Sequence, residues 1–180
     1  MKFFTPARYL RLGDLANRSA FLAAQRDWES AIADYRQHLS RIRGELPVGL
    51  RRLVETVYLH DARVLDMWWG GKTRFTITLQ PQSDPSRLVV LVYSLIAQPA
   101  VKPETLPEEV RSAPAAWLYD ELFVASESGS GDRTYTHDIL LSDGREVRLH
   151  FRNVLVTRPV PFVPDIRLAP GAPADVAHPA

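Results

Sequence analysis

The first third of the chain carries apolar side chains at the spacing of an α-helix. Between Ser19 and Arg43 they recur every three or four residues, which places them in one stripe and predicts a single long helix. Gly44 and Pro47 end this helix, and residues 48–58 are predicted to form a further short one. The stripe consists of Phe21, Ala24, Trp28, Ile32, Tyr35, Leu39, Ile42 and Leu46.

Beyond the helical third, the apolar positions alternate, which predicts β-strands. Residues 62–69 and 72–80 flank Gly70-Gly71, a favoured two-residue hairpin turn. Residues 87–97 are apolar on both faces, as a strand covered on both sides would be. Three further strands are predicted over residues 117–126, 134–141 and 145–156.

The strand region contains an internal similarity at an offset of 58 or 59 residues. The segment Leu59–Val64 resembles Leu118–Phe123, and the later strands of the two halves match in the same way. Each half is therefore predicted to be a three-stranded meander, and the pair indicates a duplication with pseudo-twofold symmetry. The alternative is chance similarity, because strand segments resemble one another.

These elements predict one α+β domain, in which N-terminal helices pack on an antiparallel sheet or partly open barrel of about six strands. The long helix is expected to lie across the sheet. Four prolines argue against a strand in the connector between the meanders, and a C-terminal segment rich in Pro and Ala is expected to be flexible. The domain spans residues 1–157, with helices in 1–58, the first meander in 59–97, the connector in 98–116 and the second meander in 117–157. The flexible tail follows in 158–180.

The last predicted hairpin could pair in two registers. A two-residue turn would place His137 opposite His150, a pair that could bind a metal. A three-residue turn ending at a left-handed Gly144 places Asp138 opposite Arg148 and keeps the apolar side chains on one face. A shift by one residue would turn half of that apolar set to solvent, so the second register is predicted, with His137 at the edge of the core.

Composition and charge narrow the function classes. The chain has 180 residues, 22 Lys and Arg against 21 Asp and Glu, and no cysteine. A net charge of +1 gives no global field toward nucleic acid or an anionic membrane. The lack of cysteine excludes a disulfide framework, a thiolate zinc site and a cysteine nucleophile. No apolar stretch approaches the roughly 18 residues needed to cross a bilayer, and no apolar signal core follows the first residues, so a cytoplasmic location is expected.

A carboxylate and histidine site at the two repeat starts is the main candidate for chemistry. His60 and Asp61 begin the first repeat and Asp120 begins the second, so they would meet if the starts approach each other. Such a group could hold Mg²⁺ or Zn²⁺ or share a proton. The alternative, which we prefer, is that each aspartate caps backbone N–H groups where its strand begins. No cofactor is predicted.

Exposed aromatic and basic side chains are candidates for contact with another molecule. Trp68 and Trp69 point to opposite faces of one strand, so one indole is expected to be exposed, where a neighbouring arginine would complete a protein-contact hot spot. Arginines also gather around the turn between the second and third helices, either to contact phosphates or an acidic partner or as a solvated face. The candidate contact residues are Trp69, Arg74, Arg36, Arg43 and Arg52.

The sequence shows no assembled catalytic constellation. The leading prediction is therefore a non-enzymatic protein-interaction module, accessory or immunity-like, whose partner is another protein or a second copy of the chain. The alternative is a metal- or small-ligand-dependent enzyme centred on the two repeat starts. Nucleic acid is disfavoured as a partner by the near-neutral charge, and no membrane partner is expected.

The opening Met1–Pro6, the helix containing Trp28 and Tyr35, and the segment Leu59–Val64 together resemble a family of uncharacterised bacterial proteins. Members of that family open with M-K-x-F-T and place a leucine–histidine–aspartate step after a helical front half. The resemblance covers roughly the first half of the chain. It implies a bacterial, cytoplasmic setting, and it implies no activity and no site residues.

Overall fold

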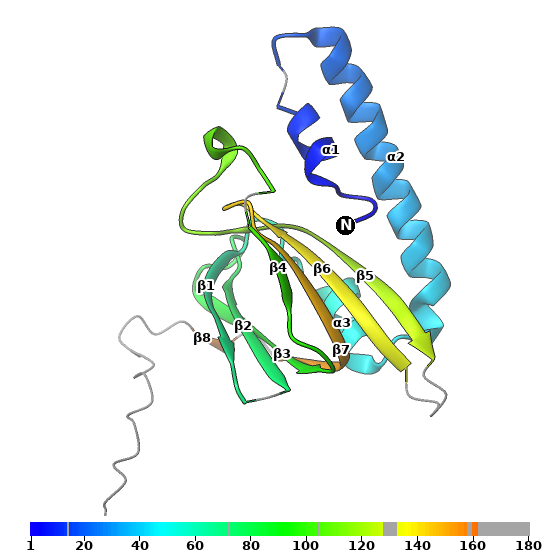
Figure 1. Cartoon of the computed structure of the whole chain (residues 1–180), viewed down its shortest axis with the longest axis vertical. Helices are drawn as coiled ribbons and strands as arrows, with labels where there is room; N and C mark the ends of the chain where they lie inside the picture. The colour runs from blue at the N-terminus through cyan, green and yellow to red at the C-terminus, as the bar shows by residue number, and fades with distance from the viewer. Residues whose placement is uncertain (14, 72, 104, 128–132, 158–159, 162–180) are drawn as a thin grey trace, which may run out of the picture.

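The chain folds into an α+β structure in which a curled antiparallel sheet follows N-terminal helices (Figure 1). The computed structural model describes all residues except 14, 72, 104, 128–132, 158–159 and 162–180. The helices are α1 (Pro6–Arg11), α2 (Arg18–Ile42) and α3 (Val48–Thr56), with short 3₁₀ turns at Arg43–Glu45 and Glu108–Val110. The strands are β1 (Arg63–Trp69), β2 (Arg74–Gln80), β3 (Arg87–Leu95), β4 (Ala100–Lys102), β5 (Trp117–Glu127), β6 (Arg133–Leu141), β7 (Glu146–Val156) and β8 (Val160–Pro161).

The sheet is built from the two predicted meanders. Its strand order is β1-β2-β3-β7-β6-β5, so β1 to β3 form one meander and β5 to β7 the other. The meanders join through their last strands, where Tyr93 of β3 pairs with Val154 of β7 in an antiparallel ladder. A pseudo-twofold axis between β3 and β7 would produce this order, which agrees with the predicted duplication. The first strands of the two meanders are the edges of the sheet.

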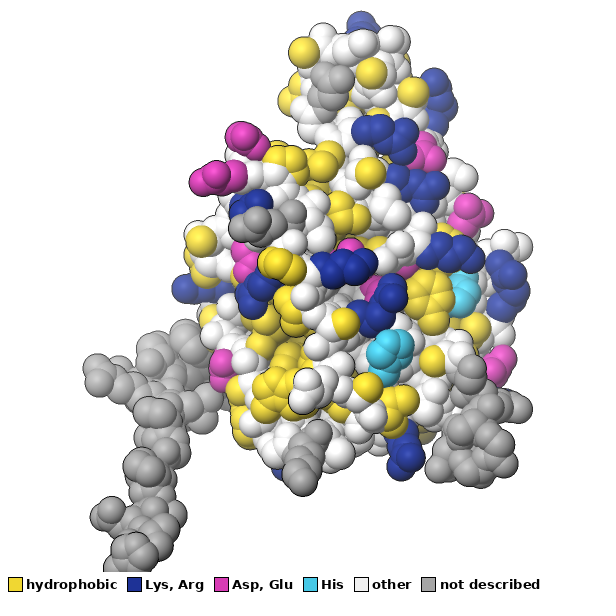
Figure 2. Space-filling view, viewed as in Figure 1, with side chains coloured by type: hydrophobic (Ala, Val, Ile, Leu, Met, Phe, Trp, Pro, Cys, Tyr) yellow, Lys and Arg dark blue, Asp and Glu magenta, His cyan; other side chains and the backbone are white. Residues whose placement is uncertain are grey.

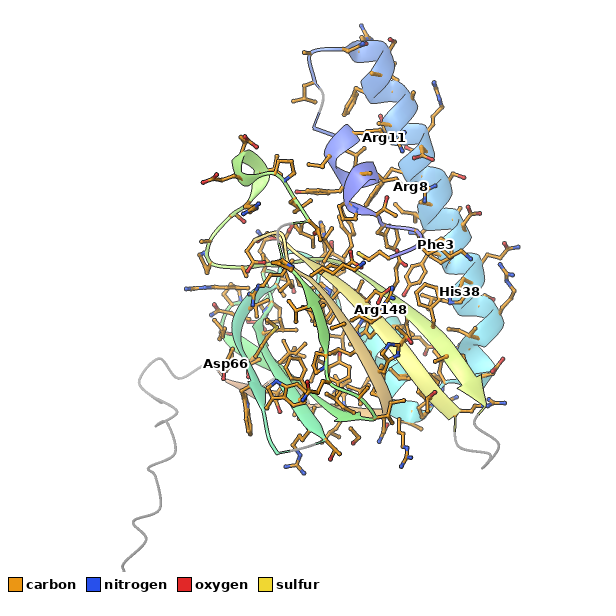
Figure 3. All side chains as sticks on the ribbon, viewed as in Figure 1. Phe3, Arg8, Arg11, His38, Asp66 and Arg148 are labelled. Atoms are coloured by element: carbon orange, nitrogen blue, oxygen red, sulfur yellow. The ribbon has the colours of Figure 1, made fainter. Side chains whose placement is uncertain are left out.

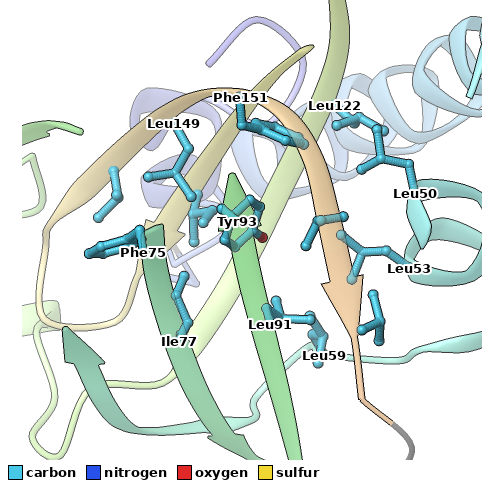
Figure 4. Packing of buried hydrophobic residues seen from close by; sticks show 14 of the residues in the cluster. Leu50, Leu53, Leu59, Phe75, Ile77, Leu91, Tyr93, Leu122, Leu149 and Phe151 are labelled. Atoms are coloured by element: carbon cyan, nitrogen blue, oxygen red, sulfur yellow. The ribbon is translucent and has the colours of Figure 1, made fainter. Parts of the chain in front are cut away.

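The concave side of the sheet holds the main core, which α3 covers (Figure 4). Leu50 and Leu53 of α3 face Tyr93 and Phe151 of the two central strands, and all four side chains are buried. The alternation of the strands explains this arrangement, because every second residue of a strand points to the same face. In β3, for example, Val89, Leu91, Tyr93 and Leu95 are buried, while the residues between them are half-buried or exposed.

Helix α2 runs alongside the edge strand β5, and its N-terminal half extends past the sheet with α1 packed on it (Figure 1). The side chain of Asn17 accepts a hydrogen bond from the Ala20 N–H and caps the start of the helix. Trp28 and Tyr35, two members of the predicted stripe, are buried. The prediction that α2 lies across the sheet was wrong. The shorter α3 covers the concave side, and the segment Met1–Phe4 covers part of the convex side.

The proline-rich connector contains a short strand, which the sequence analysis excluded. Ala100–Lys102 forms β4 and pairs with β7, where Val101 lies opposite Val147. This position is open because β3 pairs with β7 only as far as Phe151, which leaves the first residues of β7 without a neighbour on that side. Pro99 and Pro103 flank β4 and limit it to three residues.

Of the two predicted hairpin turns, the one between β6 and β7 is confirmed and the one between β1 and β2 is not. In the β6–β7 hairpin the Leu141 N–H donates to the Arg145 oxygen and Gly144 has φ +87°, so the predicted three-residue turn is confirmed. The β1–β2 connection is longer than the predicted two residues, because β2 begins at Arg74 and the Gly70 N–H donates to the Arg74 oxygen.

The predicted flexible tail lies largely outside the described residues. Within it, Val160–Pro161 forms β8 and pairs with Arg87 and Leu88 of β3. None of the helices in the described part of the chain combines the length and the apolar character that crossing a membrane requires.

Candidate functional site

The starts of the two repeats meet at one end of the sheet, as the hypothesis of a shared site requires. The Asp61 N–H donates to the Trp117 oxygen, and the Trp117 N–H donates to the Ala62 oxygen, both at 2.8 Å. The His60 Nδ1–H donates to the Leu118 oxygen at 2.5 Å, since a carbonyl oxygen can only accept. These bonds bring the first repeat start against the first residues of β5.

A cleft of about 470 Å³ opens beside this junction, between α2, α3 and β5. Its walls are mainly apolar and aromatic, with Trp28 and Tyr35 from α2, Val57 next to α3 and Tyr119 from β5. This volume is in the range of small-molecule sites in proteins. Charged or imidazole side chains line it at three positions: Arg36, His60 and Asp120.

Asp120 is the partly exposed end of a buried series of hydrogen bonds. Its Oδ2 is 2.9 Å from His137 Nε2, and His137 Nδ1 is 2.9 Å from the Tyr93 hydroxyl. The Trp117 indole N–H donates to Asp120 Oδ1, also at 2.9 Å. His137 and Tyr93 are fully buried, whereas the Asp120 side chain is 29 % exposed. This series of hydrogen bonds therefore connects the core of the sheet with the cleft.

The pKa values of Asp120 and Tyr93 indicate which of these two side chains carries a proton. Burial raises the pKa of Asp120, but the hydrogen bond and charge of His137 and the hydrogen bond from Trp117 outweigh it and lower the pKa below its ordinary value. Burial, helped by the charge of Asp120, raises the pKa of Tyr93 well above its ordinary value. Tyr93 thus stays protonated, and because an ionised Asp120 can only accept, the His137 Nε2–H donates to it.

The three predicted metal-site residues do not form one group. His60 and Asp120 line the cleft, but Asp61 does not, and its carboxylate is 3.6 Å from His60 Nε2. Over the described part of the chain, no three His, Asp or Glu side chains are placed to hold a metal ion. The preferred structural role was also wrong for Asp120, whose carboxylate accepts hydrogen bonds from His137 and Trp117 side chains and not from backbone N–H groups.

Sequence reasoning missed the partnership of His137 with Asp120. His137 was expected at the edge of the core, and it is fully buried. The sequence does contain a sign of this partnership, because His137 stands in the middle of an alternating apolar face. A polar group buried there needs a hydrogen-bonding partner. The identity of the partner depends on the pairing of β5 with β6, which places Leu122 opposite His137 and Asp120 two residues away on the same face.

A second polar cluster, of which only the Asp138–Arg148 pair was predicted, lies on the convex side of the sheet (Figure 3). Glu121 is fully buried, and its carboxylate accepts hydrogen bonds from the N–H groups of Lys2, Phe3 and Phe4 at 2.5, 2.7 and 2.5 Å. Phe3 and Phe4 then pack on Tyr35 with ring centroids 5.4 and 5.2 Å apart. Glu121 therefore fixes the segment Met1–Phe4 between the sheet and α2.

Asp138 forms the other part of this cluster. Arg148 donates to its two carboxylate oxygens at 2.6 and 2.8 Å, in the cross-strand pair that the register predicted. The Met1 amino group lies 3.4 Å from Asp138 and 3.0 Å from Glu146. Burial raises the pKa of Asp138, but Arg148 and the amino group outweigh it and lower the pKa below its ordinary value.

We expect stability to fall in acid because of Asp120 and Asp138. Both have folded pKa values below the unfolded value of about 3.9, so their contribution is complete above that pH and is lost as the pH falls through the folded values. Urea unfolding between pH 6 and about pH 2.5 should show this loss. The double variant Asp120→Asn/Asp138→Asn should be less stable at pH 6 and less dependent on pH below about 4. An unchanged pH slope in that variant would contradict the assignment.

Both tryptophans at the end of β1 are exposed, where one was expected. Trp68 is 46 % and Trp69 is 44 % exposed. Trp69 packs edge-on against Phe75 at 5.6 Å. Of the two exposed indoles, that of Trp68 lies beside Arg74, because a Cβ added at Gly70 would be 3.0 Å from Arg74 and 3.1 Å from the Trp68 ring. Phe75 pairs with Trp69, so Arg74, one residue earlier, points to the other face.

Two members of the predicted arginine cluster, Arg36 and Arg43, line one pocket, and Arg52 lines another. Arg43 forms an ion pair with Glu55 at 2.6 Å, and Arg52 donates to the Val156 oxygen at 3.4 Å. Arg36 is exposed at the rim of the cleft. On the face shown in Figure 2, lysine and arginine side chains are likewise interspersed with acidic and apolar ones. This distribution gives no continuous basic stripe for a phosphate backbone on that face.

Comparison with known proteins adds no identification. No family model matches the chain, and no curated protein matches its sequence. The resemblance of the first half to an uncharacterised bacterial family therefore stays a prediction.

Proposed function

We propose that this chain is a non-enzymatic protein-interaction module that binds a strand of another polypeptide along the free edge of β1. The observation that supports this function is the exposure of two indole rings beside an unpaired strand edge. Tryptophan is enriched at the energetic centres of protein interfaces, and an open edge offers a ready row of hydrogen-bonding groups.

The two edges of the sheet differ in how their backbone groups are satisfied. On β5, the Leu122 N–H donates to the Tyr35 hydroxyl and the Leu122 oxygen accepts from His38, both at 2.9 Å. The Leu118 oxygen accepts from His60. Side chains of α2 and of the segment before β1 therefore protect the β5 edge from pairing with another strand.

The end of β1 has no such protection. The Gly70 N–H donates to the Arg74 oxygen, and antiparallel strands alternate between bonded and non-bonded pairs, so the backbone groups of Met67 and Trp69 point away from β2. Within the described residues, no group forms a hydrogen bond with them on that side. The start of β1 is covered, because the Val64 N–H donates to the Ala115 oxygen and Arg63 pairs with Ala116, so the open stretch is the last three or four residues of β1.

A second copy of this chain is the partner that we put forward for this edge. Two β1 strands related by a twofold axis at Trp68 would place Met67 opposite Trp69 of the second copy, within the open stretch. Apolar side chains would then meet apolar side chains on one face, and the outward backbone groups of both strands would be satisfied.

Sedimentation velocity over a range of concentrations tests this pairing. The wild-type chain should form a dimer, and Met67→Pro should remain a monomer, because it removes one outward N–H without removing a β1–β2 hydrogen bond. Met67→Ala is the matched control, since it loses the same side chain but keeps the N–H, and it should still dimerise. Trp69→Ser should weaken the dimer, and Leu22→Ala, which removes an exposed apolar side chain from α2, should not.

A wild-type chain that stays monomeric at all concentrations would contradict self-pairing. Equal dimerisation by Met67→Pro and Met67→Ala would show that the dimer forms on another surface. Circular dichroism of each variant establishes that the loss of dimer is not a loss of fold.

A further inference from the structure

The cleft between α2, α3 and β5 combines mainly apolar walls with one acidic side chain, that of Asp120. Asp120 is ionised, and its carboxylate is partly exposed to the cleft. Its neighbour His137 has both ring nitrogens engaged, one with Tyr93 and one with Asp120. Among the described residues, no lysine or arginine forms an ion pair with Asp120. The exposed part of this carboxylate therefore borders the cleft without a lysine or arginine partner among these residues.

Aromatic rings line the same cleft as this carboxylate. The Tyr119 ring lies 4.7 Å from the Trp28 ring and 4.9 Å from the His60 ring, measured between centroids. Tyr58 stands at the mouth of the cleft, 69 % exposed and 6.2 Å from His60. The faces of aromatic rings are negative and attract cations, most strongly where water is partly excluded.

The neutral state of these rings is maintained by their surroundings. Burial raises the pKa of Tyr119 to about 12, with further contributions from Tyr9, Asp61 and Tyr58. Burial also raises the pKa of Tyr35 well above its ordinary value, and the charge of Asp120 adds to this effect. Near neutral pH both tyrosines are therefore uncharged, and each keeps a hydroxyl proton as a hydrogen-bond donor.

We propose that this cleft binds a small organic cation, an apolar or aromatic body that carries an ammonium group. The ammonium group would lie against the Asp120 carboxylate, and the apolar body would pack between Trp28, Val57 and Tyr58. This site is separate from the β1 edge, so it does not depend on the proposed protein interaction.

Two other classes of ligand fit the cleft less well. A metal ion would need further oxygen or nitrogen ligands near Asp120, and the described residues do not supply a group of three. An anion could be attracted by Arg36, but this side chain is exposed at the rim, where solvent and salt screen its charge. Asp120 lies deeper, and its charge is screened less.

Three probes of nearly equal shape distinguish charge from shape. Benzylammonium, benzyl alcohol and benzoate carry a positive, neutral and negative group on the same aromatic body. Binding is followed by NMR, through the signals of the Trp28 indole and the Asp120 amide, with the Trp68 and Trp69 indoles as an internal reference. Benzylammonium should bind about tenfold more tightly than benzyl alcohol, and benzoate should bind most weakly.

Substitutions in the cleft test the Asp120 carboxylate and the Tyr58 ring separately. Asp120→Asn should remove the preference for benzylammonium over benzyl alcohol, while Asp84→Asn, a matched change of an exposed aspartate outside the cleft, should leave it unchanged. Tyr58→Leu keeps the apolar bulk but removes a ring face, and it should weaken benzylammonium several-fold. Because Tyr58 is largely exposed, this variant tests the proposal even if Asp120→Asn does not fold.

Equal affinity for benzylammonium and benzyl alcohol would overturn the proposal, as would a preference for benzoate. The same conclusion would follow if folded Asp120→Asn kept the wild-type preference, or if none of the probes shifted the Trp28 signal at millimolar concentration.

Discussion

Replacing Gly49 with alanine should destabilise the fold by about 3 kcal/mol, which is the upper range for inserting a methyl group into a packed contact. Gly49 lies in α3 where the helix crosses β7, and a Cβ at this position would overlap the carbonyl oxygen of Val154 and lie 3.3 Å from its carbon. Both are backbone atoms, so no side-chain rotation can relieve the overlap. The helix would have to move away from the sheet, and Leu50 and Leu53 would lose contacts in the core.

Urea unfolding of Gly49→Ala and of a matched glycine variant measures this effect. Gly44→Ala is the control, because no atom lies within 4 Å of its added Cβ and the backbone there is helical. It should be neutral or slightly stabilising, since alanine has less conformational freedom than glycine in the unfolded chain. A Gly49→Ala protein as stable as Gly44→Ala would contradict the close approach of α3 to β7.

Glu121→Gln should destabilise the fold by about 2–3 kcal/mol, the range for hydrogen bonds to a buried charged group. The carboxylate accepts from three backbone N–H groups. Glutamine has the same shape, but its NH₂ group would face one of these donors, so one N–H would lose its acceptor and face another donor. The segment Met1–Phe4 should then separate from the sheet.

Two measurements distinguish this local effect from general loss of stability. Hydrogen exchange should accelerate first at the amides of Lys2, Phe3 and Phe4. Urea unfolding gives the overall loss, with Glu55→Gln as the control, because that glutamate forms an exposed ion pair with Arg43 and contributes little. Unchanged exchange at the three amides of Glu121→Gln would show that other contacts hold the segment.

Both substitutions affect contacts between layers of the fold. Gly49 sets the distance of α3 from the concave side, and Glu121 holds the first residues on the convex side. The sequence indicated neither role. A glycine within a short helix and a glutamate within a strand are common, and their importance depends on atoms more than 100 residues away in the chain.

The parts of the fold that could be predicted depend on local patterns. The stripe containing Trp28 and Tyr35 specified α2, because residues three and four apart share one face of a helix. The register of β6 and β7 followed from the apolar alternation and from Gly144, since a slip of one residue would expose half of the apolar side chains. The joined meanders agree with an internal similarity that is visible in the sequence alone.

The parts that could not be predicted depend on competition between elements for the same place. β4 forms because β3 leaves part of β7 unpaired, and Pro99 and Pro103 gave no sign of that opening. The pairing of Arg74 with Trp68 depends on the true length of the β1–β2 connection.

Periodicity and turn residues act over short distances, and they specify the α+β class, the long helix, the strands of the two meanders and the register of the last hairpin. Contacts between distant elements decide that α2 protects the edge at Leu122, that Asp120 joins His137 and Tyr93, and that the end of β1 has no partner among the described residues. Each of these depends on which elements meet in space, and burial and hydrogen bonding across the whole fold determine that choice.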